Sequence, residues 1–282
     1  MKLDLSLKTL PSIRIDYRRF LGTECGAHVY QRFKRALYTD NDSLIQSLNN
    51  NVLQYLPNIS AETLKVCDIG GGDGRRISQI LEFLHGKFGL QFTMDFVEQS
   101  SYLMHSFDPK DISSFTKIRN FEILFEDAKL PCGYDLIFLI HSIFGFESSL
   151  AVDKILSLLA PSGTIIVVSN AQDSFLAGLK KILDVGYEDT RFEITDLLKI
   201  LSDRGVNNRQ TSIETKWAVR KEDLAHHIDL LLEWLSLGKR ADIGEDRKRE
   251  IHEYICGNTV DLGQRMLFSE REIIVVAALA KK

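Results

Sequence analysis

Residues 66–74 constrain the fold of this chain more strongly than any other segment. They read Val-Cys-Asp-Ile-Gly-Gly-Gly-Asp-Gly, an apolar strand that ends at Asp68 and continues into a glycine loop. Glycine has no Cβ and tolerates positive φ, so such a loop lets the backbone lie directly against a ligand. The pattern predicts a buried strand, a ligand-binding turn and a following helix.

The spacing of the glycines narrows the class of ligand. Dinucleotide-binding folds use Gly-x-Gly-x-x-Gly, whereas here glycine recurs at every second position and Arg75, Arg76 and Ile77 follow. No Gly-Lys-Ser/Thr ending of a P-loop is present. Asp68 and Asp73 would repel phosphate and favour a cationic ligand, such as the ammonium and sulfonium of S-adenosylmethionine. The alternative is an ordinary glycine-rich turn between a strand and a helix.

This run resembles motif I of the class I S-adenosylmethionine-dependent methyltransferases, and acidic residues follow at the expected places. Glu98 ends a second strand, where it is placed to accept hydrogen bonds from ribose hydroxyls. In this class an acid after the third strand commonly binds the adenine amino group, which makes Asp127 the candidate; a solvated turn acid is the alternative. The predicted cofactor residues are Asp68, Gly70, Gly71, Gly72, Asp73, Glu98, Gln99, Asp127, Ala128, Ile140 and His141.

Composition excludes several other classes of function. With 44% hydrophobic and 26% charged residues, the 282-residue chain reads as an ordinary globular protein. A net charge of −4 offers no basic field for nucleic acid or an anionic membrane. The four cysteines form no Cys-x-x-Cys pair, so we expect no metal, no disulfide framework and a reducing cytoplasm. The first residues lack a signal-peptide core. We expect a small-molecule partner; monomer and homodimer both stay open.

Strand and helix patterns alternate along most of the chain. They predict a seven-stranded, mostly parallel, doubly wound Rossmann-like α/β sheet. The resemblance implies an antiparallel last strand. We expect a helical cap over residues 1–58 and a methyltransferase domain over 59–282, with a helical insertion at about 221–263 that forms a lid or substrate wall. Strands are expected near 65–69, 92–98, 121–125, 134–140, 164–169, 211–219 and 271–279, and helices at 16–37, 41–56, 191–204, 222–237 and 245–256.

Over nearly its whole length the chain is similar to the histamine N-methyltransferase family. That resemblance implies methyl transfer to a small molecule, with an amine nitrogen as the leading acceptor. Its specificity positions differ, however, because His141 and Leu103 replace glutamines and Glu270 replaces an asparagine, which argues against histamine itself. The matching segments are Tyr17-Arg18-Arg19-Phe20-Leu21, Ile69-Gly70-Gly71-Gly72 with Gly74, Val97-Glu98 with Ser100, Tyr134-Asp135, Ile165-Ile166-Val167-Val168-Ser169, Ile194-Thr195-Asp196-Leu197 and Leu267-Phe268.

The same resemblance implies where an acceptor would lie. The amine is expected near an acid of the first helix, a polar residue after the fourth strand and a polar residue before the last strand. A histidine has a suitable pKa to accept a proton, so His141 is the predicted catalytic residue, which orients or deprotonates the nucleophile. The alternative for His141 is that it only hydrogen-bonds backbone at the end of the strand. The alternative for Glu270 is that it is a surface acid at the start of a strand. The predicted substrate residues are Tyr17, Phe20, Glu24, Phe144, Phe146, Trp217 and Glu270.

Other functions stay open at this stage. O-methylation of a small metabolite would use the same cofactor residues. A protein that binds S-adenosylmethionine without catalysis could act through the helical insertion around 222–256. An NAD-dependent oxidoreductase is disfavoured by the glycine spacing. Methylation of protein or nucleic acid is weakly supported, because no Asn-Pro-Pro-Tyr-type motif follows the fourth strand.

Overall fold

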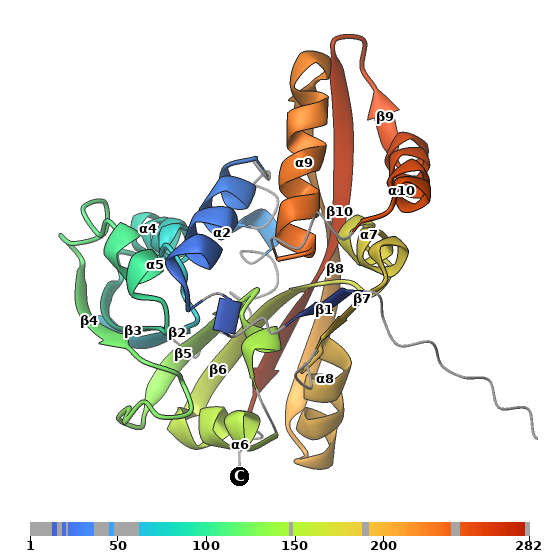
Figure 1. The fold of residues 1–282 in the computed structure, drawn as a ribbon. Helices are drawn as coiled ribbons and strands as arrows, with labels where there is room; N and C mark the ends of the chain where they lie inside the picture. Colours follow the sequence, from blue (N-terminus) through green and yellow to red (C-terminus); the bar gives the residue numbers. More distant parts are fainter. Residues whose placement is uncertain are drawn as a thin grey trace, which may run out of the picture.

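A twisted, mostly parallel sheet forms the centre of the molecule in this computed structural model (Figure 1). The structure describes residues 13–15, 19–20, 22–36, 45–47, 62–146, 149–187, 192–237 and 243–279. Within them the strands follow the order β4-β3-β2-β5-β6-β10-β8, with short β9 paired to β10, and β10 is antiparallel to both neighbours. This confirms the predicted sheet. The strands are β2 (Thr63–Ile69), β3 (Gln91–Glu98), β4 (Thr116–Glu122), β5 (Tyr134–Ile140), β6 (Leu159–Asn170), β8 (Asn207–Arg220), β9 (Thr259–Asp261) and β10 (Arg265–Ala278).

Helices cover both faces of the sheet, because the central strands alternate apolar side chains between two buried cores. On β5, Leu136 and Phe138 pack toward α4 (Arg75–Phe88) and α5 (Ser101–Ser106). Ile137 and Leu139 on the same strand pack toward α6 (Ser149–Leu158) and α8 (Ile194–Asp203). Strands buried on both faces are typical of parallel sheets.

The order of strands places the glycine loop at a switch point of the sheet. β2 lies between β3 and β5, so the connections that leave β2 and β5 run to opposite sides. In open α/β sheets, ligands bind in the crevice that such a reversal leaves at the carboxyl ends of the strands. The loop between β2 and α4 opens into this crevice.

A third core stands above the carboxyl edge of the sheet and joins helix α2 to the segment from α7 to β10. β8 and β10 extend past the other strands and carry the predicted helical insertion between them (Figure 1). Its helix α9 packs beside α2, where Phe33 stacks on Trp234 at a centroid distance of 5.0 Å and Arg32 pairs with Glu233 at 2.5 Å. The elements are α2 (Glu24–Ala36), 3₁₀ helix η1 (Ile143–Gly145), α7 (Phe175–Leu183), 3₁₀ helix η2 (Lys221–Asp223), α9 (Leu224–Leu235) and α10 (Glu245–Gly257).

Two expectations about element positions were wrong. The third strand is β4, residues 116–122, and most of the apolar run 121–125 forms the turn after it. Hydrophobicity alone marked this run as a strand, but its Phe125 is buried against α6 instead of pairing in the sheet. The first helix, expected over 16–37, contains a turn at residues 22–23, and the continuous helix α2 begins only at Glu24.

A small second sheet was not foreseen from the sequence. β1 (Ile13–Ile15) pairs in parallel with β7 (Val185–Tyr187), far along the chain. Tyr17 and most of the expected helix 41–56 lie outside the described residues, and the boundary between a cap of 1–58 and a domain of 59–282 stays a prediction. In the described part of the chain, no helix combines the length and apolarity that a bilayer crossing needs.

Candidate active site

The glycine loop has a backbone geometry that requires glycine. Gly70, Gly72 and Gly74 all have φ between 61° and 69°, in the left-handed region. Gly71 has no room for a side chain, because a Cβ there would lie 2.2 Å from the ring of Phe96 and 2.5 Å from Asp68 Oδ2. The loop therefore lies directly over the end of the sheet and exposes backbone to the crevice.

Glu98 braces this loop from the end of β3. Its Oε2 accepts a hydrogen bond from the backbone N–H of Gly72 at 2.9 Å, and its Oε1 accepts one from Ser100 at 2.8 Å. Burial raises the pKa of Glu98, while these N–H donors act in the opposite direction. Each carboxylate oxygen keeps a second lone pair, so Glu98 can still accept the two hydroxyls of a ribose.

A narrow crevice of about 90 Å³ follows the loop and the ends of β2, β3 and β5. Ligand pockets usually measure about 300–1,000 Å³, so a nucleoside must widen this one. Tyr30 of α2 covers the loop, with its hydroxyl 3.3 Å from the position of a Cβ on Gly72. The lining residues are Tyr30, Ile69, Gly70, Gly72, Val97, Glu98, Gln99, Leu103, Ile123, Leu124, Phe125, Glu126, His141, Ser142, Phe144, Gly145 and Phe146.

The turn after β4 supplies the apolar wall of this crevice. Lys154 of α6 fastens the turn by donating to the carbonyls of Phe125, Glu126 and Ala128 at 2.6, 3.0 and 2.7 Å. Glu126 lines the crevice, whereas Asp127 is exposed and Ala128 is buried behind it. Of these three residues only Glu126 borders the crevice, and a contact between Asp127 and a cofactor stays a prediction.

Asp68 is a buried acid beneath the glycine loop. Its side chain is almost fully buried, and burial together with the charge of Glu98 raises its pKa to about 8. A small cavity beside it is lined by Lys34 and Arg76, and also by Asp73 and Ile140 from the predicted set. A buried carboxyl of this kind gains most from a cationic partner.

A larger cavity of about 430 Å³ lies between the sheet edge and helices α2, α7 and α9. Aromatic and aliphatic side chains line it together with many polar groups, which include side chains from the ends of β5 and β6, the middle of β10 and helices α2, α4 and α7. Tyr30, His141 and Phe144 line this cavity and the narrow crevice alike, so the two spaces meet at His141. The aromatic lining is Tyr30, Phe33, Phe144, Phe192, Trp217 and Trp234, and the principal polar lining is Lys34, Arg76, His141, Asn170, Glu270 and Glu272.

His141 is held at this junction by an unusual backbone conformation. Its φ is 54°, which is uncommon for a residue other than glycine, and its N–H donates to Val168 at 2.8 Å. The ring Nε2 lies 3.3 Å from Oε1 of Glu272. Burial lowers the pKa of His141, Glu272 raises it, and Arg76 lowers it further, with a net fall. The imidazole is therefore neutral at pH 7 and able to accept a proton.

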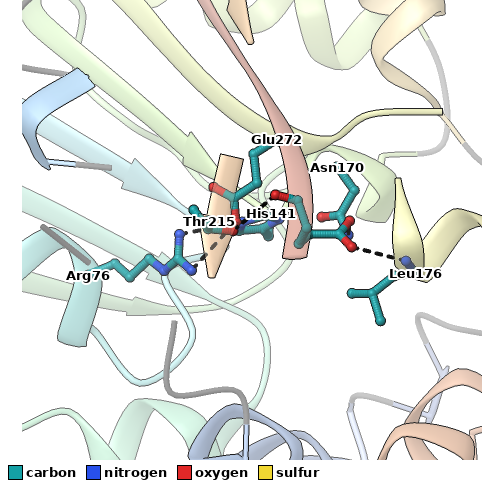
Figure 2. A network of polar contacts seen from close by, with 7 residues as sticks. Arg76, His141, Asn170, Leu176, Thr215 and Glu272 are labelled. Atoms are coloured by element: carbon teal, nitrogen blue, oxygen red, sulfur yellow. Dashed lines mark hydrogen bonds and ion pairs between the residues drawn. The ribbon is translucent and has the colours of Figure 1, made fainter. Parts of the chain in front are cut away.

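Two acids on the same face of β10 have different surroundings. Glu270 accepts hydrogen bonds from Asn170 Nδ2 at 2.9 Å and from the backbone of Leu176 at 3.0 Å, and burial raises its pKa to about 7. Glu272 lies beside His141 and Arg76 (Figure 2). Burial alone would raise the pKa of Glu272, but His141 and Arg76 lower it to about 2, so its carboxylate is charged.

Of the remaining predicted substrate residues, some line the crevice or the larger cavity and others lie away from both. Phe146 lines the narrow crevice and Trp217 the larger cavity, where its indole N–H donates to His227 at 3.0 Å. Phe20 packs against the third core without lining either space. Glu24 is exposed on α2, 3.6 Å from His28.

Tyr30, Lys34, Arg76 and Glu272 are among the residues at these spaces that did not figure among the predicted site residues. Glu272 had a usable signal, because residues two apart on a strand share a face with each other, as Glu270 and Glu272 do. Tyr30 and Lys34 belong to a helix that is distant in sequence, so only its packing reveals them.

Comparison with known proteins identifies the fold. No family model matches the sequence, and no curated protein matches it. Among solved structures, the plantazolicin methyltransferase BamL, in complex with a triazolic desmethylPZN analogue and SAH, has 13% sequence identity and a TM-score of 0.53, with 94% of each chain covered. The YcgJ protein from Bacillus subtilis has 13% identity and a TM-score of 0.50, covering 82% of this chain and 98% of its own. The chain thus has the Rossmann-like fold of the class I methyltransferases.

Proposed function

We propose that this protein transfers a methyl group from S-adenosylmethionine to a small molecule, with an amine nitrogen as the acceptor. The observation that carries the proposal is the meeting of two cavities at His141. One is bordered by the acid-and-glycine loop, and the other is a 430 Å³ space with aromatic walls and buried acids. A protein that only binds the cofactor would not need a second ligand-sized cavity beside it.

Residues of the crevice and of the small cavity beneath the glycine loop fit this cofactor. Asp68 is a buried acid suited to an ammonium group, and Glu98 is held by two N–H donors with lone pairs left for ribose. Ile123 and Leu124 offer an apolar surface for adenine, with Glu126 at its edge. When bound, S-adenosylmethionine supplies a methyl group on a sulfonium, and the bonding pair stays with sulfur as the acceptor nitrogen takes the methyl.

The protein's own contribution is to position the acceptor and accept a proton. An amine reacts only through its neutral form, and the new C–N bond leaves the nitrogen positively charged until it loses its proton. His141 is neutral at pH 7 and lines both cavities, so it can accept that proton. The lid formed by α2 and α9 excludes water and aligns the reactants, which can contribute several orders of magnitude in rate.

Hydroxyl acceptors are the competing possibility, because His141 could accept a phenol proton in the same way. Calorimetry with S-adenosylhomocysteine and NAD should come first, followed by turnover with panels of amines, phenols and carboxylic acids, with products identified by mass spectrometry. We expect binding of S-adenosylhomocysteine alone and turnover on amines. Binding of NAD without S-adenosylhomocysteine would exclude the proposal, and turnover on phenols alone would replace nitrogen with oxygen as the acceptor.

His141 can be tested against a matched histidine. We expect His141→Ala to reduce methyl transfer at least about tenfold, as is usual for a general base, while cofactor binding persists. His226→Ala on the exposed face of α9 is the control and should leave turnover unchanged. Full turnover of His141→Ala with normal cofactor binding would exclude a role for this residue in the reaction.

A further inference from the structure

The larger cavity contains two buried carboxylates, at alternate positions of β10. They differ in how many of their oxygen lone pairs are still able to accept a hydrogen bond from a ligand. Glu270 already accepts hydrogen bonds from Asn170 and from the first turn of α7 at Leu176. Ser174 also hydrogen-bonds the side chain of Glu270. These contacts tie β10 to β6 and α7, so this carboxylate has a structural use that requires no ligand.

Glu272 is bound differently. Its Oε1 faces His141 Nε2 at 3.3 Å, but its buried Oε2 has no hydrogen-bond partner among the residues that the structure describes. Arg76 Nη2 lies 3.8 Å from Oε1 of this carboxylate, which is an ion-pair distance and longer than a hydrogen bond. An unsatisfied carboxylate oxygen in a buried site costs free energy, and such an atom in a native structure calls for an explanation.

We propose that Glu272 selects the methyl acceptor: its Oε1 orients His141, and its Oε2 accepts an N–H of a primary or secondary amine. This inference rests on the proposed function, and it names the acceptor class for the same site. Glu272 lines the 430 Å³ cavity next to His141, at the junction with the crevice. The two oxygens of one carboxylate can accept from different donors at the same time, so Oε2 can accept an incoming N–H while Oε1 still faces His141.

One carboxylate then contacts both the base and the nucleophile. Nε2 of His141 lies 3.3 Å from Oε1 and 3.5 Å from Arg76 Nη1, and we assign to it the tautomer whose Nε2 proton is directed at Oε1. The lone pair of the neutral ring then lies on Nδ1, which accepts the proton. As the methyl–sulfur bond breaks and the carbon–nitrogen bond forms, the amine proton passes to His141. Glu272 stabilises the resulting imidazolium, because it is charged and adjacent.

This geometry also predicts how many methyl groups are transferred. A neutral primary or secondary amine still has an N–H for Oε2, whereas a neutral tertiary amine has none. Methylation should therefore end at the tertiary amine. The aromatic walls, which include Trp217, Trp234 and Phe33, fit an amine with an aromatic body better than a short aliphatic one.

The selection can be measured by binding to protein saturated with S-adenosylhomocysteine. The probes are three amine–alcohol pairs: phenethylamine and 2-phenylethanol, tryptamine and tryptophol, and hexylamine and hexanol. For the wild type we expect at least one amine to bind about tenfold or more tightly than its alcohol, because the amine is protonated near pH 7 and its ammonium pairs with the charged Glu272 carboxylate, whereas the alcohol offers only a neutral O–H. Glu272→Gln should reduce that preference to about threefold or less.

Two matched variants separate this role from general damage. Glu270→Gln changes the neighbouring buried acid and should keep the preference for the amine, although its stability should fall. Glu214→Gln changes an exposed acid on β8 and should behave as the wild type. Equal affinity for amine and alcohol in all three wild-type pairs overturns the proposal, and so does a preference that survives in Glu272→Gln.

A ligand-free readout tests the positioning of His141. Glu272 raises the pKa of His141, so in Glu272→Gln an NMR titration should place the imidazole midpoint at lower pH than in the wild type. An unchanged midpoint contradicts the contact. Mass spectrometry should detect no quaternary product from N,N-dimethylphenethylamine, and its formation would refute the N–H requirement. Failure of S-adenosylhomocysteine to bind would remove the proposed function as well, whereas these outcomes remove only the inference.

Discussion

Replacing Asp68 with asparagine should stabilise the protein while it damages the site. Asp68 is almost fully buried, and burial together with the charge of Glu98 raises its pKa from 3.8 to about 8. In the unfolded chain the same carboxyl ionises freely. For a group whose pKa is raised on folding, its contribution to stability is fully present below the unfolded pKa and is lost as pH rises through the folded pKa.

The size of the effect follows from these two values. Between pH 3.8 and pH 8, each pH unit lowers the contribution of Asp68 to the free energy of unfolding by about 1.36 kcal/mol. The accumulated loss reaches roughly 4 kcal/mol at pH 7. Asparagine does not ionise, so Asp68→Asn avoids this loss of unfolding free energy. The cost of burying the amide of asparagine offsets part of that gain. That offset does not change with pH, so the advantage of the variant should grow by about 2–3 kcal/mol between pH 5 and pH 7.

Urea unfolding at pH 5 and pH 7 measures this difference, with Asp111→Asn as an exposed control that should stay within about 0.5 kcal/mol of the wild type. In the same variant, S-adenosylhomocysteine should bind at least about tenfold more weakly, because its ammonium group would ionise the Asp68 carboxyl on binding and asparagine cannot supply that charge. A stability difference that does not change between the two pH values would show that Asp68 is already ionised in the folded protein. Unchanged cofactor affinity would remove Asp68 from the site.

Three further predictions concern the loop, the turn and the histidine. Gly71→Ala should cost about 1–3 kcal/mol in unfolding free energy, because its Cβ would meet Phe96 at 2.2 Å, whereas Gly86→Ala, with open space inside α4, should stabilise by about 0.5–1 kcal/mol. Lys154→Met removes three bonds to carbonyls of the crevice turn, and calorimetry and thermal unfolding should show weaker S-adenosylhomocysteine binding and a loss of about 2 kcal/mol. The imidazole of His141 should titrate below pH 6.5 by NMR, because burial lowers its pKa; a midpoint above 6.5 contradicts that cause.

The parts of the site that were predictable from the sequence are those specified by local geometry. The glycine loop depends on backbone conformations that its own residues adopt, and Glu98 on its position at the end of an apolar strand. The course of the chain after β4 could not be predicted from the local sequence, because a residue distant in sequence determines it. Its run of apolar residues resembles a strand, yet Lys154, about 30 residues later, holds it as a turn.

The choice between two acids on β10 could not be made from sequence either. Both Glu270 and Glu272 point to the same face of the strand, so periodicity treats them alike. What distinguishes them is the register of β10 against β6, which places Glu272 opposite Asn170 and leaves Glu270 to reach the start of α7. Such a register is fixed by pairing between distant segments, which no local pattern encodes.

Helices α2 and α9, the proposed lid, connect the narrow crevice with the larger cavity through side chains that contact both. Tyr30 covers the glycine loop and also packs against Trp234, with a ring-centroid distance of 5.3 Å. In the proposed enzyme a nucleoside would widen the crevice, and where α2 moves to admit it, the ion pair between Arg32 and Glu233 would pass that movement to α9. α9 in turn forms part of the wall of the larger cavity. Under the proposed function, the space offered to the acceptor should therefore depend on whether the crevice is filled, and acceptor binding should be measured on protein loaded with S-adenosylhomocysteine.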